Sequence, residues 1–367
     1  MKHASIRAPR SSLLRVSGGL IACLIGLGLL RFFLQRKTAE QIRIVSPAGI
    51  ATLEQIRLGG VDQWIQIRGE DGTKPLLLFL HSGPGFPEMP FSHVNARLEK
   101  EFVVVHWDQR GAGKSYSSSI PESSMTIEQF ISDTHELVQL LLKRFGASKL
   151  YLVAHSWGSM IGALTVAKYP ELFEAYAGIS QAANAPESER MMYRFALETA
   201  AREANEKAAA ELRRLGPPPY DNFANYRTMK GWVHHFRDTG YTEISPWKFA
   251  RLALASPAYS WGDLLRLVLG MRFSFSNLWP EAFYRTNLFT QVPKLDVPVY
   301  FFLGRRDRTV TASAALAEQY FQRLNAPKGK HLIWFENSGH WPQLEEPEKF
   351  RAALIGQLHD STPKARE

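Results

Sequence analysis

The sequence predicts an α/β protein in which a mostly parallel sheet is flanked by helices and interrupted by a helical cap. Runs of strand length that are apolar at every position, with helical patterns between them, predict the sheet. The alternation stops between about residues 181 and 287, which predicts the cap. The first expected elements are strands at residues 52–58 and 63–68, which alternate in polarity around the turn Gly59-Gly60 and form a hairpin.

The buried strands are expected at five apolar runs, which are residues 76–80, 102–106, 150–154, 297–303 and 332–335. A helix is expected up to Phe145, where apolar residues follow helical spacing and Thr126 forms a capping box with Gln129. The predicted cap begins with one helix rich in alanine and charged residues (187–215), followed by three consecutive prolines and aromatic helical segments.

The length of 367 residues suits one large α/β domain with an insertion. We expect a basic segment and anchor at residues 1–40, core at 41–180, cap at 181–287 and core again at 288–367. The single cysteine excludes an internal disulfide. We expect no metal and no cofactor, because the sequence has no cluster of His, Cys and Asp with metal-ligand spacing.

The net charge of +9 is concentrated at the N-terminus. Residues 1–43 hold eight Lys or Arg and one acid, Glu40, so the rest of the chain is close to neutral. A protein that binds a polyanion carries its basic residues on the binding domain. We therefore expect no nucleic-acid partner.

Residues 16–30 carry no charge, and the apolar stretch extends to residue 34 if Arg31 reaches a lipid interface. A cleaved signal peptide is one interpretation, but no suitable cleavage site follows. A lipoprotein modified at Cys23 is a second, although few apolar residues precede the cut. An uncleaved single-pass transmembrane anchor at 16–34 fits best. The basic residues before it favour a position of the remaining chain on the exported face.

The strongest chemical signal is Ser156, which follows the apolar run 150–154 and precedes a helix of small residues. A serine on a sharp strand-to-helix turn projects its hydroxyl away from the backbone, and small residues two positions away relieve crowding. The usual G-x-S-x-G pattern has glycine where Ala154 stands, and a methyl group is tolerable there. A serine that only caps the helix is the alternative.

A serine nucleophile needs a base to take its proton and an acid to orient that base. On a strand–turn–helix site of this kind, the three residues follow the order Ser, Asp, His. Asp307 follows the run 297–303 and His340 follows the run 332–335. Because the carboxyl ends of parallel strands converge, we expect a catalytic triad of Ser156, Asp307 and His340. Asp307 as a turn or capping carboxylate is the alternative.

The oxyanion of an acyl intermediate needs N–H donors that are already in place. One should be the backbone N–H of Trp157, directly after the nucleophile. The other should come from the loop after residues 76–80, where Pro84 has no N–H and Gly83 lets the backbone approach a substrate. An ordinary glycine–proline turn is the alternative interpretation of this loop.

The segment Gly113-Lys114-Ser115 resembles the end of a phosphate-binding loop. That loop requires glycine five residues before Gly113, where Asp108 stands, so we expect no nucleotide. Arg110, in the same segment, is expected to form a buried ion pair with a partner that the sequence does not identify.

Five motifs together resemble the α/β-hydrolase superfamily, and more narrowly its prolyl-iminopeptidase-like serine peptidase branch. They are HSGPG (81–85), DQRGAGKS (108–115), HSWGS (155–159), GRRD (304–307) and SGH (338–340). The resemblance covers about residues 50–180 and 288–355 and implies an α/β-hydrolase fold. It carries the family's nucleophile, acid, base and oxyanion donors onto Ser156, Asp307, His340, Trp157 and Gly83.

The sequence also departs from the family pattern. Ser82, Ala154 and His155 stand where the family has glycine. The cap lacks the family's W-x-x-W-E segment, whose glutamate helps to bind the substrate amine. Glu281 is a candidate for that glutamate, and a solvated residue of a helix is the alternative interpretation.

We therefore expect a serine hydrolase that needs no cofactor and acts through an acyl-enzyme. The resemblance implies an aminopeptidase of prolyl-iminopeptidase type, which releases an N-terminal residue from small peptides or amides. A carboxylic ester hydrolase on the same triad is one alternative, and a non-catalytic, membrane-tethered binding protein is another of a different class. Haloalkane and epoxide hydrolases are disfavoured, because they use an aspartate nucleophile where Ser156 stands.

Overall fold

The computed structural model describes residues 10–236, 244–307 and 314–361, so the basic residues before residue 10 lie outside the described part. Its centre is an eight-stranded sheet in the order β1-β2-β4-β3-β5-β6-β7-β8. The pairs β1–β2 and β2–β4 are antiparallel, and every later pair is parallel. The predicted class, a mostly parallel sheet flanked by helices, is confirmed.

The strands are β1 (Ile50–Leu58), β2 (Val61–Gly69), β3 (Leu76–Leu80), β4 (Val103–Asp108), β5 (Leu150–His155), β6 (Phe173–Ile179), β7 (Val299–Gly304) and β8 (Lys330–Phe335). The core helices are α2 (Ile127–Phe145), α3 (Trp157–Lys168), α9 (Leu288–Gln291), α10 (Ala314–Arg323), α11 (Pro342–Glu345) and α12 (Pro347–Ser361). Short 3-10 helices are η1 (Met89–Lys100), η2 (Gly113–Ser115), η3 (Glu122–Ser124) and η4 (Pro170–Leu172). The helices between β6 and β7 are α4 (Ala185–Arg202), α5 (Glu206–Leu215), α6 (Phe223–His235), α7 (Pro246–Ala255) and α8 (Trp261–Tyr284), and α1 (Arg10–Gln41) precedes the sheet.

The central strands are apolar on both faces because helices cover both faces. In β3, Leu76, Leu78 and Leu80 pack on one side with α2, α3 and α10. Leu77 and Phe79 pack on the other side with η1 and α12. The continuous apolar runs of the sequence therefore correspond to strands with two buried faces.

Two elements differ from the sequence prediction. The strand β6 was not predicted, because its sequence FEAYAGI contains Glu174 and two alanines and is not a continuous run of large apolar residues. The helix expected at 187–215 is two helices, α4 and α5, and Asn205 caps the second by accepting a hydrogen bond from the N–H of Ala208. Asparagine is favoured at such a cap because its side chain satisfies a free backbone donor.

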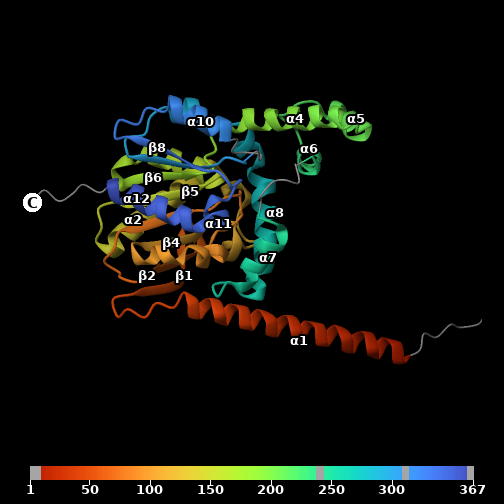
Figure 1. Cartoon of the computed structure of the whole chain (residues 1–367), viewed down its shortest axis with the longest axis horizontal. Helices are drawn as coiled ribbons and strands as arrows, with labels where there is room; N and C mark the ends of the chain where they lie inside the picture. The colour runs from red at the N-terminus through yellow and green to blue at the C-terminus, as the bar shows by residue number, and fades with distance from the viewer. Residues whose placement is uncertain (1–9, 237–243, 308–313, 362–367) are drawn as a thin grey trace, which may run out of the picture.

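The helices α4–α8 gather at one end of the sheet (Figure 1). The long helix α8 lies against the loops that follow β3 and β4. Its Ser274 hydroxyl donates to the carbonyl of Gly111 at 3.0 Å, and a Cβ atom on Gly85 would lie 2.6 Å from the Cβ of Ser274. The cap therefore sits directly over the loops that carry the sequence motifs.

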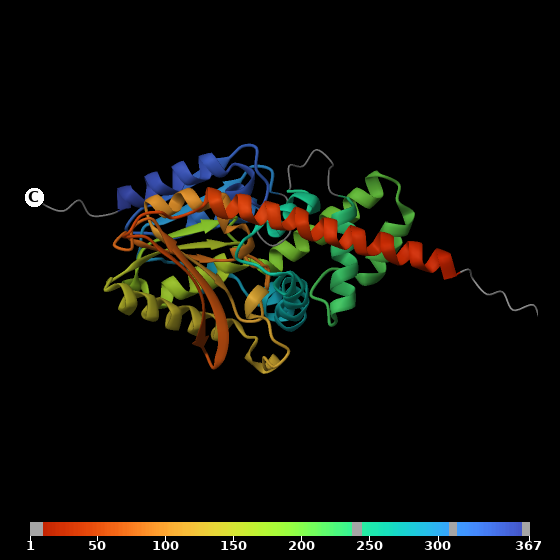
Figure 2. The ribbon, with the colours of Figure 1, turned by 90° about the horizontal axis from the view of Figure 1, so that it is seen from below.

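The N-terminal helix α1 packs against the cap (Figures 1 and 2). The guanidinium of Arg31 donates to the carbonyl of Tyr259 at 2.6 Å and lies 4.2 Å from the centre of the Trp261 ring. The amide of Gln35 donates to the carbonyls of Ser256 (2.6 Å) and Tyr259 (3.0 Å). Both side chains hold the linker between α7 and α8.

This packing corrects the expectation for the N-terminus. Arg31, which was expected to reach a lipid interface, is only 3% exposed and faces the cap. Within the residues that the structure describes, no helix combines the length and the apolar character needed to cross a membrane. The predicted transmembrane anchor at residues 16–34 is therefore not supported.

The variant Arg31→Ala should lower the free energy of unfolding by about 1.5–3 kcal/mol, because it removes a charged hydrogen-bond donor from a buried carbonyl. Arg36→Ala is the matched control on the same helix, since Arg36 lies in an exposed ion pair with Glu40. That change should cost at most about 1 kcal/mol. Urea unfolding measures both, and equal effects would contradict the packing of α1 on the cap.

Candidate active site

Ser156 lies at a sharp turn between β5 and α3. Its backbone has φ 53° and ψ −113°, a conformation that non-glycine residues rarely adopt. Its N–H donates to the carbonyl of Ile179 in β6 at 3.0 Å, which holds the turn against the sheet. The methyl of Ala154 is accommodated because Gly162 of α3 lies opposite, where a Cβ atom would approach Ala154 to 2.9 Å. This pair explains how the chain tolerates alanine at the first position of the motif.

Asp307 and His340 are brought together by the neighbouring strands β7 and β8. The Nδ1 atom of His340 lies 2.9 Å from Oδ2 of Asp307. The Asp307 side chain is 1% exposed and that of His340 is 13% exposed. A carboxylate can only accept, so Nδ1 carries the hydrogen and Nε2 of the neutral ring is left to accept a proton.

The loops that carry these two residues cross in direct contact. A Cβ atom on Gly304 would lie 1.9 Å from the carbonyl oxygen of Gly339, so only glycine fits at this crossing. The N–H of Arg306 donates to the carbonyl of Ser338 at 3.0 Å, and the N–H of Asp307 donates to the carbonyl of Gly304 at 3.1 Å. The backbone therefore sets the separation of the acid and the base.

The Ser156 turn also contacts the His340 loop. Nε2 of His155 lies 2.8 Å from the carbonyl oxygen of His340, and the Ser180 hydroxyl donates to the same oxygen at 3.1 Å. The centres of the His155 and His340 rings are 5.0 Å apart. The structure thus brings Ser156, Asp307 and His340 to one edge of the sheet, while their catalytic roles stay predictions.

The loop after β3 lies beside the Ser156 turn because β3 and β5 pair in parallel. Gly83 has φ 137°, which favours glycine. The side-chain oxygen of Gln109 accepts from Nε1 of Trp157 at 3.2 Å, and the backbone N–H of Gln109 donates to Nε2 of His81 at 3.0 Å. Burial lowers the pKa of His81 to about 4, so its ring stays neutral and can accept. Gln109 therefore links the two segments that carry the expected oxyanion donors, Gly83 and Trp157.

Arg110 forms the buried ion pair that the sequence predicts, and its partner is Asp133 of α2. Nε and the NH2 nitrogen of Arg110 lie 2.9 and 3.0 Å from the two carboxylate oxygens, and neither side chain is exposed. Lys114, in the phosphate-loop-like segment, pairs with Asp263 of α8 at 2.8 Å. Burial raises the pKa of Asp108 to about 7, and this carboxyl group accepts a hydrogen bond from the Tyr259 hydroxyl.

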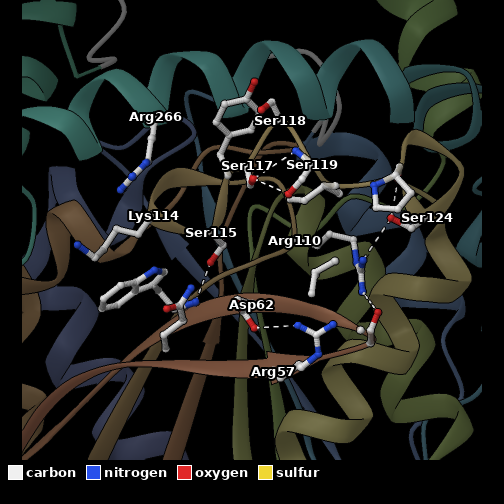
Figure 3. A pocket seen from close by; sticks show the side chains of 18 of the residues that line it. Arg57, Asp62, Arg110, Lys114, Ser115, Ser117, Ser118, Ser119, Ser124 and Arg266 are labelled. Carbon is white, nitrogen blue, oxygen red and sulfur yellow. Dashed lines mark hydrogen bonds and ion pairs between the residues drawn. The ribbon is translucent and has the colours of Figure 1, made fainter.

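One cavity lies between the β1–β2 hairpin, the segment after β4 and helix α8, and no residue of the predicted triad lines it (Figure 3). It has a volume of about 970 Å³, and its basic lining residues are Arg57, Arg110, Lys114 and Arg266. Each of them already pairs with a carboxylate, such as Arg57 with Asp62 at 3.2 Å and Arg266 with Asp263 at 3.0 Å. We therefore assign no anionic ligand to this cavity.

A smaller cavity of about 400 Å³ lies beside Asp307. The cap helix α4 lines it with Met191, Met192 and Phe195, and β8 contributes Trp334. Arg305 and Glu318 also line the cavity, so the side formed by the Met, Phe and Trp side chains is the part that is suited to an apolar group.

Several residues around the site were not identified from the sequence, among them Gln109, Glu88 and Gln343. Gln109 lies inside the motif 108–115, whereas Glu88 and Gln343 lie a few residues from other motifs. Their roles could not be predicted, because each contacts a distant part of the chain. Glu281, the loose candidate for amine binding, lies next to Glu128 of α2, and burial together with that carboxylate raises its pKa. In the described part of the chain, no group of three or more His, Cys, Asp or Glu could hold a metal ion.

Several known proteins are similar to this chain. The alpha/beta hydrolase fold family matches residues 75–347. "Probable aminopeptidase YbaC" of Bacillus subtilis (strain 168) is 39% identical over 313 residues, which cover 83% of this chain and 95% of that protein. "Proline iminopeptidase" of Heyndrickxia coagulans is 24% identical over 301 residues, which cover 80% and 93%.

Among solved structures, the proline iminopeptidase of Mycobacterium smegmatis matches with a TM-score of 0.61 at 19% identity, over 84% of this chain and 98% of that one. This likeness concerns the fold. The family match spans most of the chain, and the similar curated proteins include an aminopeptidase and proline iminopeptidases. The chain therefore belongs to the α/β-hydrolase family, as an enzyme of its prolyl-iminopeptidase-like branch.

Proposed function

We propose that this enzyme is a serine hydrolase that releases the N-terminal residue of small peptides or amides through an acyl-enzyme on Ser156. The observation that carries the proposal is the 2.9 Å contact between Nδ1 of His340 and Oδ2 of Asp307, at the sheet edge where Ser156 lies. The relatives named aminopeptidase and proline iminopeptidase support the substrate class.

In this proposal, Oγ of Ser156 attacks the substrate carbonyl while Nε2 of His340 takes the hydroxyl proton. Asp307 stabilises the imidazolium that forms, and His340 gives the proton to the leaving amine. A water molecule then attacks the acyl-enzyme while Nε2 of His340 takes its proton. The bond from the acyl carbon to Oγ of Ser156 breaks, His340 gives the proton to this oxygen, and the acid product leaves.

The oxyanion of each tetrahedral intermediate would be held by the backbone N–H groups of Gly83 and Trp157. Such donors act only if they are in place before the reaction. The contacts from Gln109 to His81 and to Trp157 support this role, because they tie the Gly83 loop to the Ser156 turn.

The binding of a free amine calls for a carboxylate that faces the substrate. In the cap, Glu189 is buried and pairs with Lys230 at 3.0 Å, and burial raises its pKa to about 7. Glu281 lies beside Glu128. Because both carboxylates are engaged inside the protein, ester hydrolysis on the same triad is the second candidate function.

The experiment compares the full chain with Ser156→Ala on proline p-nitroanilide, alanine p-nitroanilide and p-nitrophenyl acetate, with fluorophosphonate labelling of both proteins. We expect labelling of the wild-type chain only, and a loss on the order of 10⁶ in kcat in the variant. Cleavage of the anilides supports the aminopeptidase, whereas cleavage of the acetate alone favours the esterase. A folded wild-type chain that is neither labelled nor active would show a binding protein and refute the proposal.

Asp307→Asn should lower kcat by about 10⁴, because the amide keeps the geometry but favours the wrong tautomer of the His340 ring. The measurement is steady-state hydrolysis of the best substrate from the same panel. Glu336→Gln is the control, since Glu336 lies in an exposed ion pair with Arg305. Full activity in Asp307→Asn would show that another acid serves His340.

We also propose that the enzyme rests on a lipid surface through an apolar face formed by α1, α7 and α8. Large apolar side chains that these helices expose are Ile25, Leu27, Leu29, Leu30, Phe32, Phe33, Trp247, Trp261, Leu265, Val268 and Leu269. Exposed basic residues on the same helices are Arg36, Lys37, Arg251, Arg266 and Arg272. An apolar face with tryptophan and basic residues is typical of helices that lie in the interface of an anionic membrane. The exported position of the catalytic domain stays a prediction from the charge bias.

The full chain should co-sediment with vesicles of phosphatidylglycerol and phosphatidylcholine. Replacement of Trp247, Leu265 and Val268 by serine should weaken binding at least about tenfold, because each apolar side chain that leaves water stabilises the bound state by roughly 1.5–3 kcal/mol. The control replaces Val45 and Leu53, which are also exposed but lie outside these helices. Equal binding of all three proteins would contradict the proposal. A wild-type dimer that becomes monomeric when Trp247, Leu265 and Val268 are replaced would also contradict it.

A further inference from the structure

Besides Asp307, His340 contacts His155, which belongs to a set of three buried polar side chains. The set consists of His155, which ends β5, Gln343, in α11, and Glu88, in the loop after β3. Their exposed fractions are 1%, 0% and 4%. A carboxylate buried this deeply costs free energy unless hydrogen bonds compensate for the lost water. None of the three residues belongs to the proposed triad.

The contact to His340 identifies which nitrogen of His155 carries the hydrogen. Nε2 of His155 lies 2.8 Å from the carbonyl oxygen of His340, and a carbonyl can only accept. Nε2 is therefore the donor. Burial lowers the pKa of His155, so its ring is neutral and Nδ1 must accept. The hydrogen for Nδ1 comes from Nε2 of Gln343, 3.2 Å away.

Glu88 fixes the orientation of the Gln343 amide. Oε1 of Glu88 lies 3.0 Å from the same nitrogen, whose two hydrogens are thereby shared between Glu88 and His155. A reversed amide would turn its oxygen toward the carboxylate and toward the lone pair of Nδ1. Glu88 thus orients Gln343, Gln343 sets the tautomer of His155, and that tautomer supplies the donor to His340.

A protonated His155 paired with Glu88 is the competing arrangement, since Nδ1 and Oε2 are 3.7 Å apart. In that arrangement His155 would be a buried cation, with its ring centre 5.0 Å from that of His340. The mechanism requires the His340 ring itself to become an imidazolium. Like charges at this distance oppose one another, and the lowered pKa of His155 agrees with the neutral ring.

The carbonyl of His340 is also held by the Ser180 hydroxyl, at 3.1 Å. Ser180 follows β6 and His155 ends β5, so two adjacent strands clamp the backbone of the base. Because Ser156 is the next residue after His155, the same clamp sets the distance between the base and the nucleophile. A misplacement of about 1 Å between reacting groups can cost on the order of 100-fold in rate.

We infer that His155 is a positioning residue, which Glu88 and Gln343 hold in one tautomer so that it fixes the backbone of His340 relative to Ser156. This inference rests on the proposed function and adds to it a residue that departs from the glycine of the family motif. Its role is distinct from that of Asp307, which acts on the ring of His340, whereas His155 acts on the main chain.

The test measures kcat and KM for p-nitrophenyl acetate, and the rate of fluorophosphonate labelling, in His155→Leu, His155→Gln and Ser180→Ala. Leucine keeps the bulk but removes the donor, whereas the amide nitrogen of glutamine lies about as far along the side chain as Nε2. We expect kcat and the labelling rate to fall about 10–100-fold in His155→Leu with KM changed less than about twofold, and His155→Gln to recover to within about threefold. Ser180→Ala should lower kcat a few-fold.

His135→Leu is the matched control, because His135 stacks on Tyr169 (ring centres 3.9 Å apart) and should leave all rates unchanged. An active wild-type chain with unchanged kcat in His155→Leu would overturn the inference alone, whereas an inactive, unlabelled wild-type chain would overturn the proposed function. A rise in KM without rescue by glutamine would show general packing and also overturn it. If His155→Leu does not unfold cooperatively, it is not properly folded, and the test then uses Ser180→Ala. An unchanged kcat in Ser180→Ala would overturn the inference.

Discussion

The ion pair between Arg110 and Asp133 is the interaction on which the arrangement of the other parts depends. Neither side chain touches solvent, and the Asp133 carboxylate also accepts from the amides of Gln63 (2.8 Å) and Gln129 (2.7 Å). Arg110 further donates to the carbonyl of Gly59 in the β1–β2 turn at 2.8 Å. A buried charge is stable only when its partners are complete, and the loss of one partner typically costs about 3–5 kcal/mol. The pair therefore fixes the segment after β4 to both α2 and the hairpin.

The two residues before Arg110, Asp108 and Gln109, connect the loop after β3, the Ser156 turn and the cap. Gln109 joins the end of β3 at His81 to the nucleophile turn at Trp157. The Asp108 carboxyl group accepts a hydrogen bond from the Tyr259 hydroxyl. The carbonyl of Tyr259 in turn accepts a hydrogen bond from Arg31 of α1. The three consecutive buried residues 108–110 thus connect the sheet, the catalytic loops and the cap through side-chain contacts and one backbone N–H.

Much of the fold and of the candidate site follows from local sequence patterns. The buried strands are continuous apolar runs, and the turn at Ser156 is set by small residues within a few positions of it, so both could be predicted from short windows. The strand β6 was not predicted, because its alanines and its glutamate interrupt the run of large apolar residues that indicates a buried strand. Asp133 could not be named as the partner of Arg110, since nothing in the sequence links residues 23 positions apart on different elements. The docking of α1 was beyond prediction for the same reason, and its apolar residues suggested lipid rather than the cap.

The N-terminal helix has a consequence for the order in which the molecule is completed. The hydrogen bonds of Gln35 and Arg31 reach carbonyls 221–228 residues later in the chain. Synthesis proceeds from the N-terminus, so α1 leaves the ribosome long before the linker that it binds has been made. Contacts between such distant segments also close late, because the loop entropy is lost before the contact is gained. During synthesis the buried side chain of Arg31 and that of Gln35 therefore lack the carbonyls that they bind in the finished protein, and α1 cannot dock until the α7–α8 linker has been made. The joining of α1 to the α7–α8 linker then marks the point at which the cap is complete.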